Sequence, residues 1–409
     1  MMRTSLDRNR VTLFLCGLVA LCEGIDLQAA GLAAAGISTE FKPAPDQLGT
    51  FFGASTFGLF LGALIGGRLA DSFGRKWVLI ASVATFGVFS LCSPAAWSIE
   101  SLTAARFLTG LGLGGALPLL VALASEVSSV QRQSANVTLV YAGAPFGGGL
   151  ASILSLLIAT DRWRLLFFVG GVLPLLLCPL MAMGLRDSIG SPANGRREPP
   201  GGDGIAVKRG SIAAIFSQGR ALPTLLLWVS FFFALLLLYL LLSWLPTLIV
   251  SRGLSHAQAS AAQIGFNIGG AATAVLVGWL LETRARKIVY VATYLVLPLL
   301  LILVAKSPVD PVLVTTSVFL LGCGVLAAQA CLYTIAPGTY PFPIRGIGLG
   351  AAVAMGRVGS IVGPKLGGYL KSAGHPPAQM LMDILPIVIV GSICALLLSR
   401  YRSATPHPP

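Results

Sequence analysis

Charged residues are scarce in this sequence, and their scarcity excludes most classes of soluble protein. Only 11% of the 409 residues are Asp, Glu, Lys or Arg, whereas 55% are hydrophobic, and the mean hydropathy is +0.84. Soluble globular domains carry about 25% charged residues. A water-soluble core of this size does not need so much apolar sequence, so the composition indicates a chain that crosses a membrane several times.

Histidine and paired cysteine motifs are also lacking. The three histidines, His256, His375 and His407, lie in predicted loops or in the C-terminal tail. The seven cysteines fall within apolar runs, and none has CxxC spacing or a histidine at metal-binding spacing. Cysteine in such surroundings behaves as a small core residue. We therefore expect no disulfide framework, no metal site and no bound cofactor.

Twelve apolar runs are long enough to cross the ~30 Å hydrocarbon core of a bilayer as helices. Six precede and six follow one long polar stretch, whose Pro- and Gly-rich segment 191–204 is typical of a flexible linker. We predict an all-α polytopic membrane protein with a six-helix bundle at residues 1–185, a linker at 186–221 and a second six-helix bundle at 222–409. The predicted spans are residues 11–35, 48–70, 77–97, 101–124, 134–158, 164–185, 222–250, 259–281, 288–305, 311–334, 346–370 and 380–400.

Lysine and arginine are distributed unevenly between the loops. With the N-terminus inside, nineteen lie in inner loops and tails and six in outer loops, while Arg106, Arg357 and Lys365 lie in or near spans. The positive-inside rule therefore predicts that both termini and the linker are cytoplasmic. Because the basic residues lie in short loops and not on a soluble domain, the net charge of +13 does not indicate a nucleic-acid partner.

Two carboxylates interrupt the first apolar run. Glu23 lies at the middle of residues 11–35, and Asp26 follows three positions later, so both side chains leave the same helix face. Carboxylates at that depth are too costly to face lipid, and by default they are functional or paired inside a bundle. Arg106, at a comparable depth in the fourth run, is either a partner for Asp26 or an outer-rim residue that reaches water. Arg357, in the middle of the eleventh run, either grips an anionic substrate through its planar guanidinium or pairs with one of the carboxylates.

The short turn between the second and third runs, residues 67–76, carries a charged motif with one acidic and three basic residues. On residues alone it fits either a solvated loop or a charge latch that one conformation makes and another breaks. It matches G-x-x-x-D-R/K-x-G-R-R/K, the signature that the major facilitator superfamily carries in this loop, and departs from it at Ser72, where a basic residue is usual. The equivalent loop of the second half, residues 278–287, matches loosely and indicates an internal repeat. The candidate latch residues are Gly67, Asp71, Gly74, Arg75 and Lys76.

Within that superfamily, residues 23–26 resemble the D-G-x-D motif in the first helix of the aromatic acid:proton symporter family, with Glu23 in place of the first Asp. The longer stretch 23–31 resembles the branch that carries 3-(3-hydroxyphenyl)propionate, and the resemblance extends to the glycine-rich segments 110–118 and 356–359. It implies a multi-pass transporter of the bacterial inner membrane that imports an aromatic carboxylate such as 3-(3-hydroxyphenyl)propionate. The resemblance further implies protons as the coupling ion, alternating access of two bundles, and a monomer working in the lipid bilayer.

Polar residues in the spans are candidates for the two tasks of such a transporter. An arginine early in the fourth helix is tied to proton coupling in the superfamily, so the candidate coupling residues are Asp26, Glu23 and Arg106. The uncharged candidates for substrate binding fit interhelical hydrogen bonds equally well. The candidate substrate-binding residues are Arg357, Gln28, Tyr141, Asn267, Gln329 and Tyr333.

Two other functions stay open on the sequence alone. Residues 142–148 resemble, with an offset, the G-P-x-x-G-G motif of superfamily exporters, which favours a proton-driven exporter. The other alternative is a membrane-embedded enzyme or receptor. The lack of buried histidine, of metal-ligand spacing and of a soluble catalytic domain argues against it.

Overall fold

The computed structural model is almost entirely helical in the part of the chain that it describes. It describes residues 2–129, 132–185, 213–341 and 344–401, and all side chains in these ranges except those of residues 2–8, 71, 133–135, 138, 213, 346 and 401. The α-helices are α1 (Met2–Phe41), α2 (Pro45–Phe73), α3 (Arg75–Cys92), α4 (Ile99–Glu126), α5 (Gln133–Leu157), α6 (Arg164–Gly184), α7 (Ala213–Phe216), α8 (Ala221–Ser251), α9 (His256–Leu280), α10 (Arg286–Lys306), α11 (Pro311–Ile335), α12 (Arg345–Ser372) and α13 (Pro377–Leu398). The short 3-10 helices are η1 (Ser93–Ala95), η2 (Thr160–Arg162), η3 (Ala336–Thr339) and η5 (Ser399–Tyr401).

Among the described residues, twelve helices are long and apolar enough to cross a membrane. They correspond in order to the twelve predicted spans, so the predicted all-α, twelve-span fold is confirmed. The largest difference in length is at α1, which begins before residue 11 and continues beyond residue 35 to Phe41. Apolar length predicts where a helix crosses lipid, but it does not predict how far the helix continues into water.

The described part of the predicted linker is not all flexible chain. Residues 213–216 form the short helix α7, in which Ala214 and Ile215 are buried. Thr224 of α8 donates a hydrogen bond to the Ile215 carbonyl oxygen at 2.8 Å, which holds α7 against the second bundle. The rest of the predicted linker, residues 186–212, lies outside the described residues.

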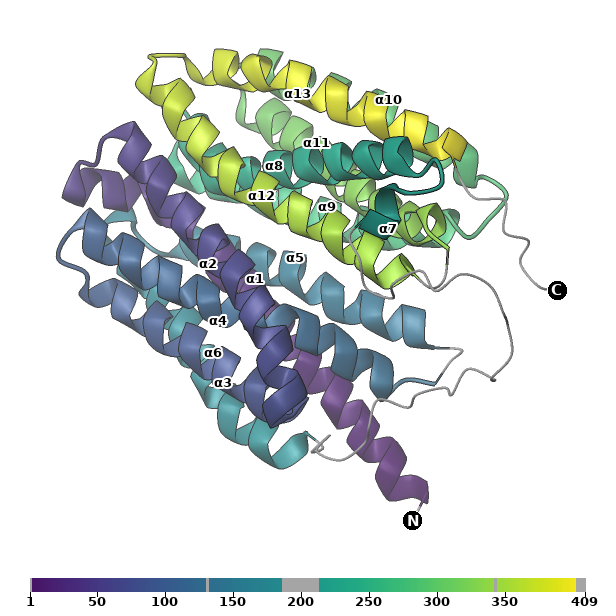
Figure 1. Cartoon of the computed structure of the whole chain (residues 1–409). Helices are drawn as coiled ribbons and strands as arrows, with labels where there is room; N and C mark the ends of the chain where they lie inside the picture. Colours follow the sequence, from purple (N-terminus) through teal and green to yellow (C-terminus); the bar gives the residue numbers. More distant parts are fainter. Residues whose placement is uncertain (1, 130–131, 186–212, 342–343, 402–409) are drawn as a thin grey trace.

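The long helices form two bundles, α1 to α6 and α8 to α13, which lie side by side in Figure 1. The same pairs of helices pack in each bundle. In the first, α2 packs on α4 and α1 packs on α5; in the second, α9 packs on α11 and α8 packs on α12. This correspondence is what the internal repeat predicts. Between the halves, α12 packs on α2 and α1 packs on α8, so α1 and α12 lie at the interface.

Glycines bring α4 close to two neighbours. Gly110 and Gly114 lie against backbone carbonyl oxygens of α2, and a Cβ at either position would collide with them. On another side of α4, Gly112 lies equally close to the Phe86 backbone of α3. Small residues at such contacts let helix backbones approach within the membrane. The glycine-rich run therefore wedges α4 between α2 and α3 and fixes the position of Arg106, one turn earlier.

The two halves also approach each other closely at the ends of the helices farthest from the N-terminus. A Cβ built on Gly368 of α12 would lie 3.0 Å from the Cα of Gly49 in α2. The Ser155 hydroxyl of α5 lies 3.2 Å from His256 Nε2 and 3.1 Å from the Ser260 hydroxyl, both in α9. These contacts involve the starts of α2 and α9 and the ends of α5 and α12. The halves are therefore closed on that side of the molecule.

Candidate functional site

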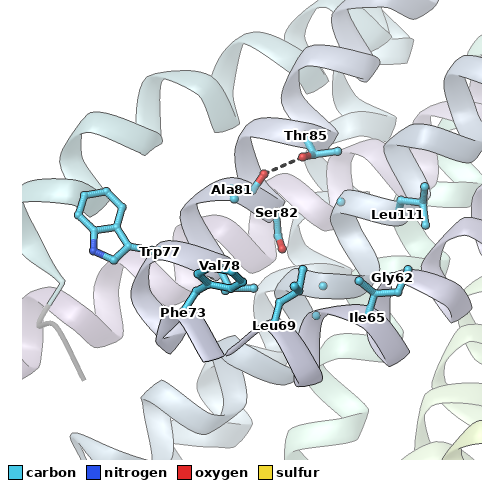
Figure 2. Close-up of a pocket in the computed structure, with 13 residues that line it drawn as sticks. Gly62, Ile65, Leu69, Phe73, Trp77, Val78, Ala81, Ser82, Thr85 and Leu111 are labelled. Atoms are coloured by element: carbon cyan, nitrogen blue, oxygen red, sulfur yellow. Dashed lines mark hydrogen bonds between the residues drawn. The ribbon is translucent and has the colours of Figure 1, made fainter. Parts of the chain in front are cut away.

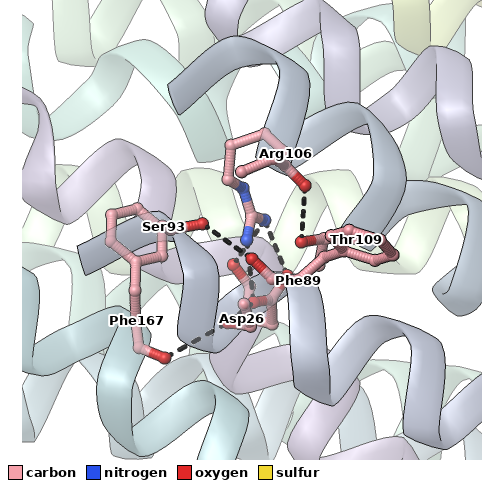
Figure 3. A network of polar contacts seen from close by, with 8 residues as sticks. Asp26, Phe89, Ser93, Arg106, Thr109 and Phe167 are labelled. Atoms are coloured by element: carbon pink, nitrogen blue, oxygen red, sulfur yellow. Dashed lines mark hydrogen bonds and ion pairs between the residues drawn. The ribbon is translucent and has the colours of Figure 1, made fainter. Parts of the chain in front are cut away.

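Asp26 and Arg106 form a buried ion pair within the first half. Arg106 Nη1 and Nη2 donate to the two carboxylate oxygens of Asp26 at 2.8 and 2.6 Å, and both residues are 0% exposed. Ser90 of α3 donates to the same carboxylate at 2.7 Å, and the guanidinium carbon lies 5.1 Å from the ring centroid of Phe167 in α6 (Figure 3). The predicted pairing is confirmed. The alternative, an Arg106 that reaches water at the outer rim, is wrong.

The pair links the protonation of Asp26 to the packing of four helices. Removing one charge of a buried pair leaves the other without a counter-ion, which costs about 3–5 kcal/mol. A proton on Asp26 removes its charge as effectively as a mutation does. Arg106 Nε has no hydrogen-bond partner among the described residues, so the hydrogen bonds of this guanidinium go to Asp26. Loss of the Asp26 charge therefore leaves Arg106 without a counter-ion among the described residues.

Gly24 separates the two carboxylates for a packing reason. A Cβ at this position would collide with the Ala144 carbonyl group of α5, so only glycine lets α1 and α5 approach as they do. A Cβ on Gly147 of α5 would likewise collide with the Leu21 carbonyl oxygen of α1. The glycine of the E-G-x-D motif therefore fixes α1 against its neighbour in the same half.

Glu23 has different surroundings from Asp26. It is 2% exposed and makes no hydrogen bond to any described residue, and its electrostatic neighbours are Arg357 and Asp26. Arg357 comes from α12 in the other half, and its Nη1 donates to the Tyr239 hydroxyl of α8 at 2.9 Å. Among the described side chains, no carboxylate lies within ion-pair distance of Arg357. Glu23 and Arg357 therefore influence each other across the halves without a direct ion pair.

Aromatic rings from both halves lie beside Arg357. The ring centroids of Tyr141 in α5 and Tyr333 in α11 are 6.4 Å apart, and Phe231 of α8 packs edge to face on Tyr333 at 5.2 Å. Both tyrosines are electrostatic neighbours of Arg357, and they are 46% and 38% exposed. Part of each ring is therefore accessible to a ligand. A guanidinium flanked by rings can hold a planar anion by hydrogen bonds and ring contacts together.

The amide residues predicted as substrate contacts have different surroundings from the tyrosines. Gln28 Oε1 accepts hydrogen bonds from Gln263 Nε2 and Asn267 Nδ2, each at 3.1 Å, and Gln28 Nε2 donates to the Leu242 carbonyl oxygen at 3.3 Å. These bonds join α1 to α9 and α8, so Gln28 and Asn267 hold the halves together in this conformation. Gln329 is 6% exposed, and its amide nitrogen has no hydrogen-bond partner among the described residues.

The charged turn between α2 and α3 is only partly described. Gly74 has φ of +84°, a backbone conformation that favours glycine, and so it allows the tight turn. Arg75 forms an ion pair with Glu126 at the end of α4, and Lys76 is buried. The side chain of Asp71 lies outside the described residues, so the predicted latch between Asp71 and Arg75 stays a prediction.

Four residues of these networks are missing from the sequence-based predictions: Ser90, Tyr239, Gln263 and Glu126. Gln263 precedes Asn267 by four positions, and this helical spacing places both amides on one face. Tyr239 is the only residue with a polar group between positions 231 and 242. Both signals were available in the sequence. Ser90 carries no comparable signal, because isolated serines in apolar helices usually bond their own backbone.

Comparison with known proteins identifies the family. The sequence profile of the Major Facilitator Superfamily matches residues 16–364 and 251–408. A 3-(3-hydroxy-phenyl)propionate transporter of Escherichia coli (strain K12) is 38% identical over 401 residues, which cover 98% of this chain and 96% of that protein. The 4-hydroxybenzoate transporter PcaK of Pseudomonas putida is 34% identical over 394 residues, which cover 91% and 88%.

A solved structure agrees on the fold. The crystal structure of a D-xylose-proton symporter superposes with a TM-score of 0.78 at 16% identity and covers 96% of this chain and 97% of its own. The relatives and the family are transporters, not enzymes, so the alternative of a membrane-embedded enzyme is dismissed. The chain belongs to the major facilitator superfamily and, within it, to the transporters of aromatic acids.

Proposed function

We propose that this chain imports an aromatic carboxylate, such as 3-(3-hydroxyphenyl)propionate, together with protons. One observation carries the proposal: Arg357 has no carboxylate partner among the described residues and lies among the rings of Tyr141 and Tyr333, which come from opposite halves. A substrate carboxylate supplies the missing counter-ion, and its aromatic ring packs against the tyrosines. The names of the two relatives above, which are 38% and 34% identical, point to the same class of substrate.

Protons are coupled to this anion through the carboxylates of α1. Charged Glu23 competes with a substrate carboxylate for Arg357 and repels it, whereas protonated Glu23 does neither. A proton on Asp26 releases Arg106 from its buried ion pair and thereby loosens the contact of α1 with α4. Protons and the anion therefore favour the same occupied state, and this is the physical requirement for symport.

The direction of opening follows from the charge of the loops. We place both termini in the cytoplasm and the protein in the bacterial inner membrane, because the basic residues are concentrated on the side of the termini. The closed contacts at Gly49 and Gly368 then lie on the periplasmic side. Tyr141, in the first third of α5, and Tyr333, at the end of α11, then lie toward the cytoplasmic side, and both rings are exposed. We therefore assign this arrangement to the inward-open state and propose a monomer that works by alternating access.

Uptake into proteoliposomes tests the proposal. With labelled 3-(3-hydroxyphenyl)propionate and an acidic exterior, we expect the wild type to accumulate substrate against its gradient. Asp26→Asn is expected to abolish accumulation while leaving exchange of internal for external substrate partly intact, and Glu23→Gln to affect mainly affinity. Asp46→Asn, which changes an exposed carboxylate at the start of α2, is the matched control. Accumulation by Asp26→Asn under a pH gradient alone would exclude Asp26 as the coupling site.

The same assay separates import from export. The exporter alternative rests on residues 142–148, whose Gly143 and Gly147 lie against Ala20 and Leu21 of α1. Close packing of α5 on α1 accounts for these glycines without any role in export. Outward flux of substrate driven by an acidic exterior would nevertheless favour the exporter. Inward flux under that gradient favours the symporter.

A further inference from the structure

An apolar groove lies between α2, α3 and α4, on a part of the surface that the proposed transport site does not use (Figure 2). Its volume is about 490 Å³. Leu69 and Phe73 line its α2 wall, Trp77 and Ala81 line its α3 wall, and Leu111 of α4 lies in its floor. The groove exists because α2 and α3 each pack more extensively on α4 than on one another. The two helices meet at the Gly74 turn and then separate.

The groove opens on the surface of a bundle of membrane-spanning helices, and its lining does not suit a polar ligand. Three residues of the groove walls, Leu69, Phe73 and Trp77, are 41%, 64% and 49% exposed. The lining includes only two hydroxyl side chains, Ser82 and Thr85, and the Thr85 hydroxyl already donates to the Ala81 carbonyl oxygen of its own helix at 2.8 Å (Figure 2). No lining side chain is charged, so an aromatic carboxylate bound here would lack a counter-ion. The chemistry of the groove fits a hydrocarbon chain.

The length of the groove matches one leaflet. Its α2 wall runs from Gly62 to Phe73, and this distance along the helix is about 16 Å at a rise of about 1.5 Å per residue. This length is close to half of the ~30 Å hydrocarbon core.

One end of the groove lies at the Gly74 turn and is lined by Trp77, a residue type that gathers at membrane interfaces. Exposed Arg68 lies about 9 Å before that turn on α2, between the lining residues Ile65 and Leu69, and its long side chain can reach the interface. We propose that this groove binds an acyl chain of an anionic phospholipid from that leaflet, with its headgroup beside Arg68.

Photo-crosslinking in nanodiscs tests this site directly. The probe is phosphatidylglycerol with a diazirine at the end of one acyl chain, and cross-linked residues are mapped by mass spectrometry. We expect adducts to concentrate on the groove walls and to exceed those at Val88, an α3 residue that is 46% exposed but does not line the groove. A phosphatidylcholine probe is expected to label the groove about fivefold less, since one basic residue near the interface favours anionic lipid by roughly that factor.

Two variants distinguish a binding site from general lipid contact. Ala81→Phe fills the groove and is expected to abolish the excess labelling, whereas Val88→Phe, the matched control, leaves it unchanged. Arg68→Gln is expected to remove the preference for phosphatidylglycerol. Should Ala81→Phe fail to fold, displacement of the wild-type adducts by unlabelled phosphatidylglycerol replaces it. Adducts spread evenly over the exposed faces of α2 and α3, or equal labelling by both lipids, would overturn the proposal.

Discussion

Replacing Asp26 by asparagine is expected to destabilise this protein unless Arg106 is replaced as well. Both residues are 0% exposed, and two hydrogen bonds of 2.8 and 2.6 Å join them. Asparagine keeps the shape of the side chain but leaves the guanidinium buried without a counter-ion, at a cost of about 3–5 kcal/mol. Ser90→Ala removes only one hydrogen bond to the same carboxylate, about 1.5–3 kcal/mol. The double variant Asp26→Asn, Arg106→Gln leaves no unpaired charge, so part of the loss is recovered.

Thermal unfolding of the purified proteins, followed by tryptophan fluorescence, ranks the stabilities of the wild type and of these variants. We expect the apparent midpoint to fall from wild type to Ser90→Ala and further to Asp26→Asn, with the double variant above Asp26→Asn. An Asp26→Asn protein as stable as the wild type would refute the reasoning, because it would mean that the buried pair contributes no net attraction. Additive losses in the double variant would refute it equally. Uptake by the folded double variant then reports the coupling role separately from stability.

Three further predictions concern Arg357, the side on which the halves are closed, and the charged turn between α2 and α3. Arg357→Lys keeps the charge but loses the two-donor fork, so KM for the aromatic acid is expected to rise about tenfold or more, from the loss of one charge-assisted bond. Gly368→Val is expected to open the side where Gly368 meets Gly49, detected by labelling of introduced cysteines from that side. Asp71→Asn is expected to shift the population toward the inward-facing state, measured by cysteine accessibility from the cytoplasm.

Each of these predictions has its own contrary result. An unchanged KM in Arg357→Lys and Arg357→Ala would return Arg357 to a structural role. Gly350→Val is the control for Gly368→Val, since no atom lies within 4 Å of a Cβ at position 350 in the same helix. Equal labelling of these two variants would mean that the glycine contact does not hold the halves closed. Wild-type accessibility in an Asp71→Asn protein that has lost transport would point to a defect other than the latch.

The sequence predicts the spans well, because the thickness of the bilayer fixes the length of an apolar helix. It also predicts the partner of Asp26, because equal depth in two helices leaves few other counter-ions for a buried charge. Depth does not predict which neighbours complete a network. Gln28 and Asn267 are polar residues of the kind that bind substrates, yet they bond to each other, because α5 packs on α9 and α1 packs on α8 across the halves. Tyr239 bonds Arg357 for the same reason, through the packing of α8 on α12.

The two carboxylates of α1, Glu23 and Asp26, have different electrostatic partners although they lie one helical turn apart. Asp26 is bonded to Arg106 and Ser90 within the first half, and Gly24 fixes α1 against α5 of that half. If the halves rock as rigid bodies, this network moves as one unit, and rocking alone does not separate the pair. Glu23 instead faces a cation of the other half, so rocking changes its separation from Arg357 directly. Under the proposed symport, rocking of the halves therefore acts directly on Glu23, whereas the charge of Asp26 is linked to the contact of α1 with α4 inside the first half.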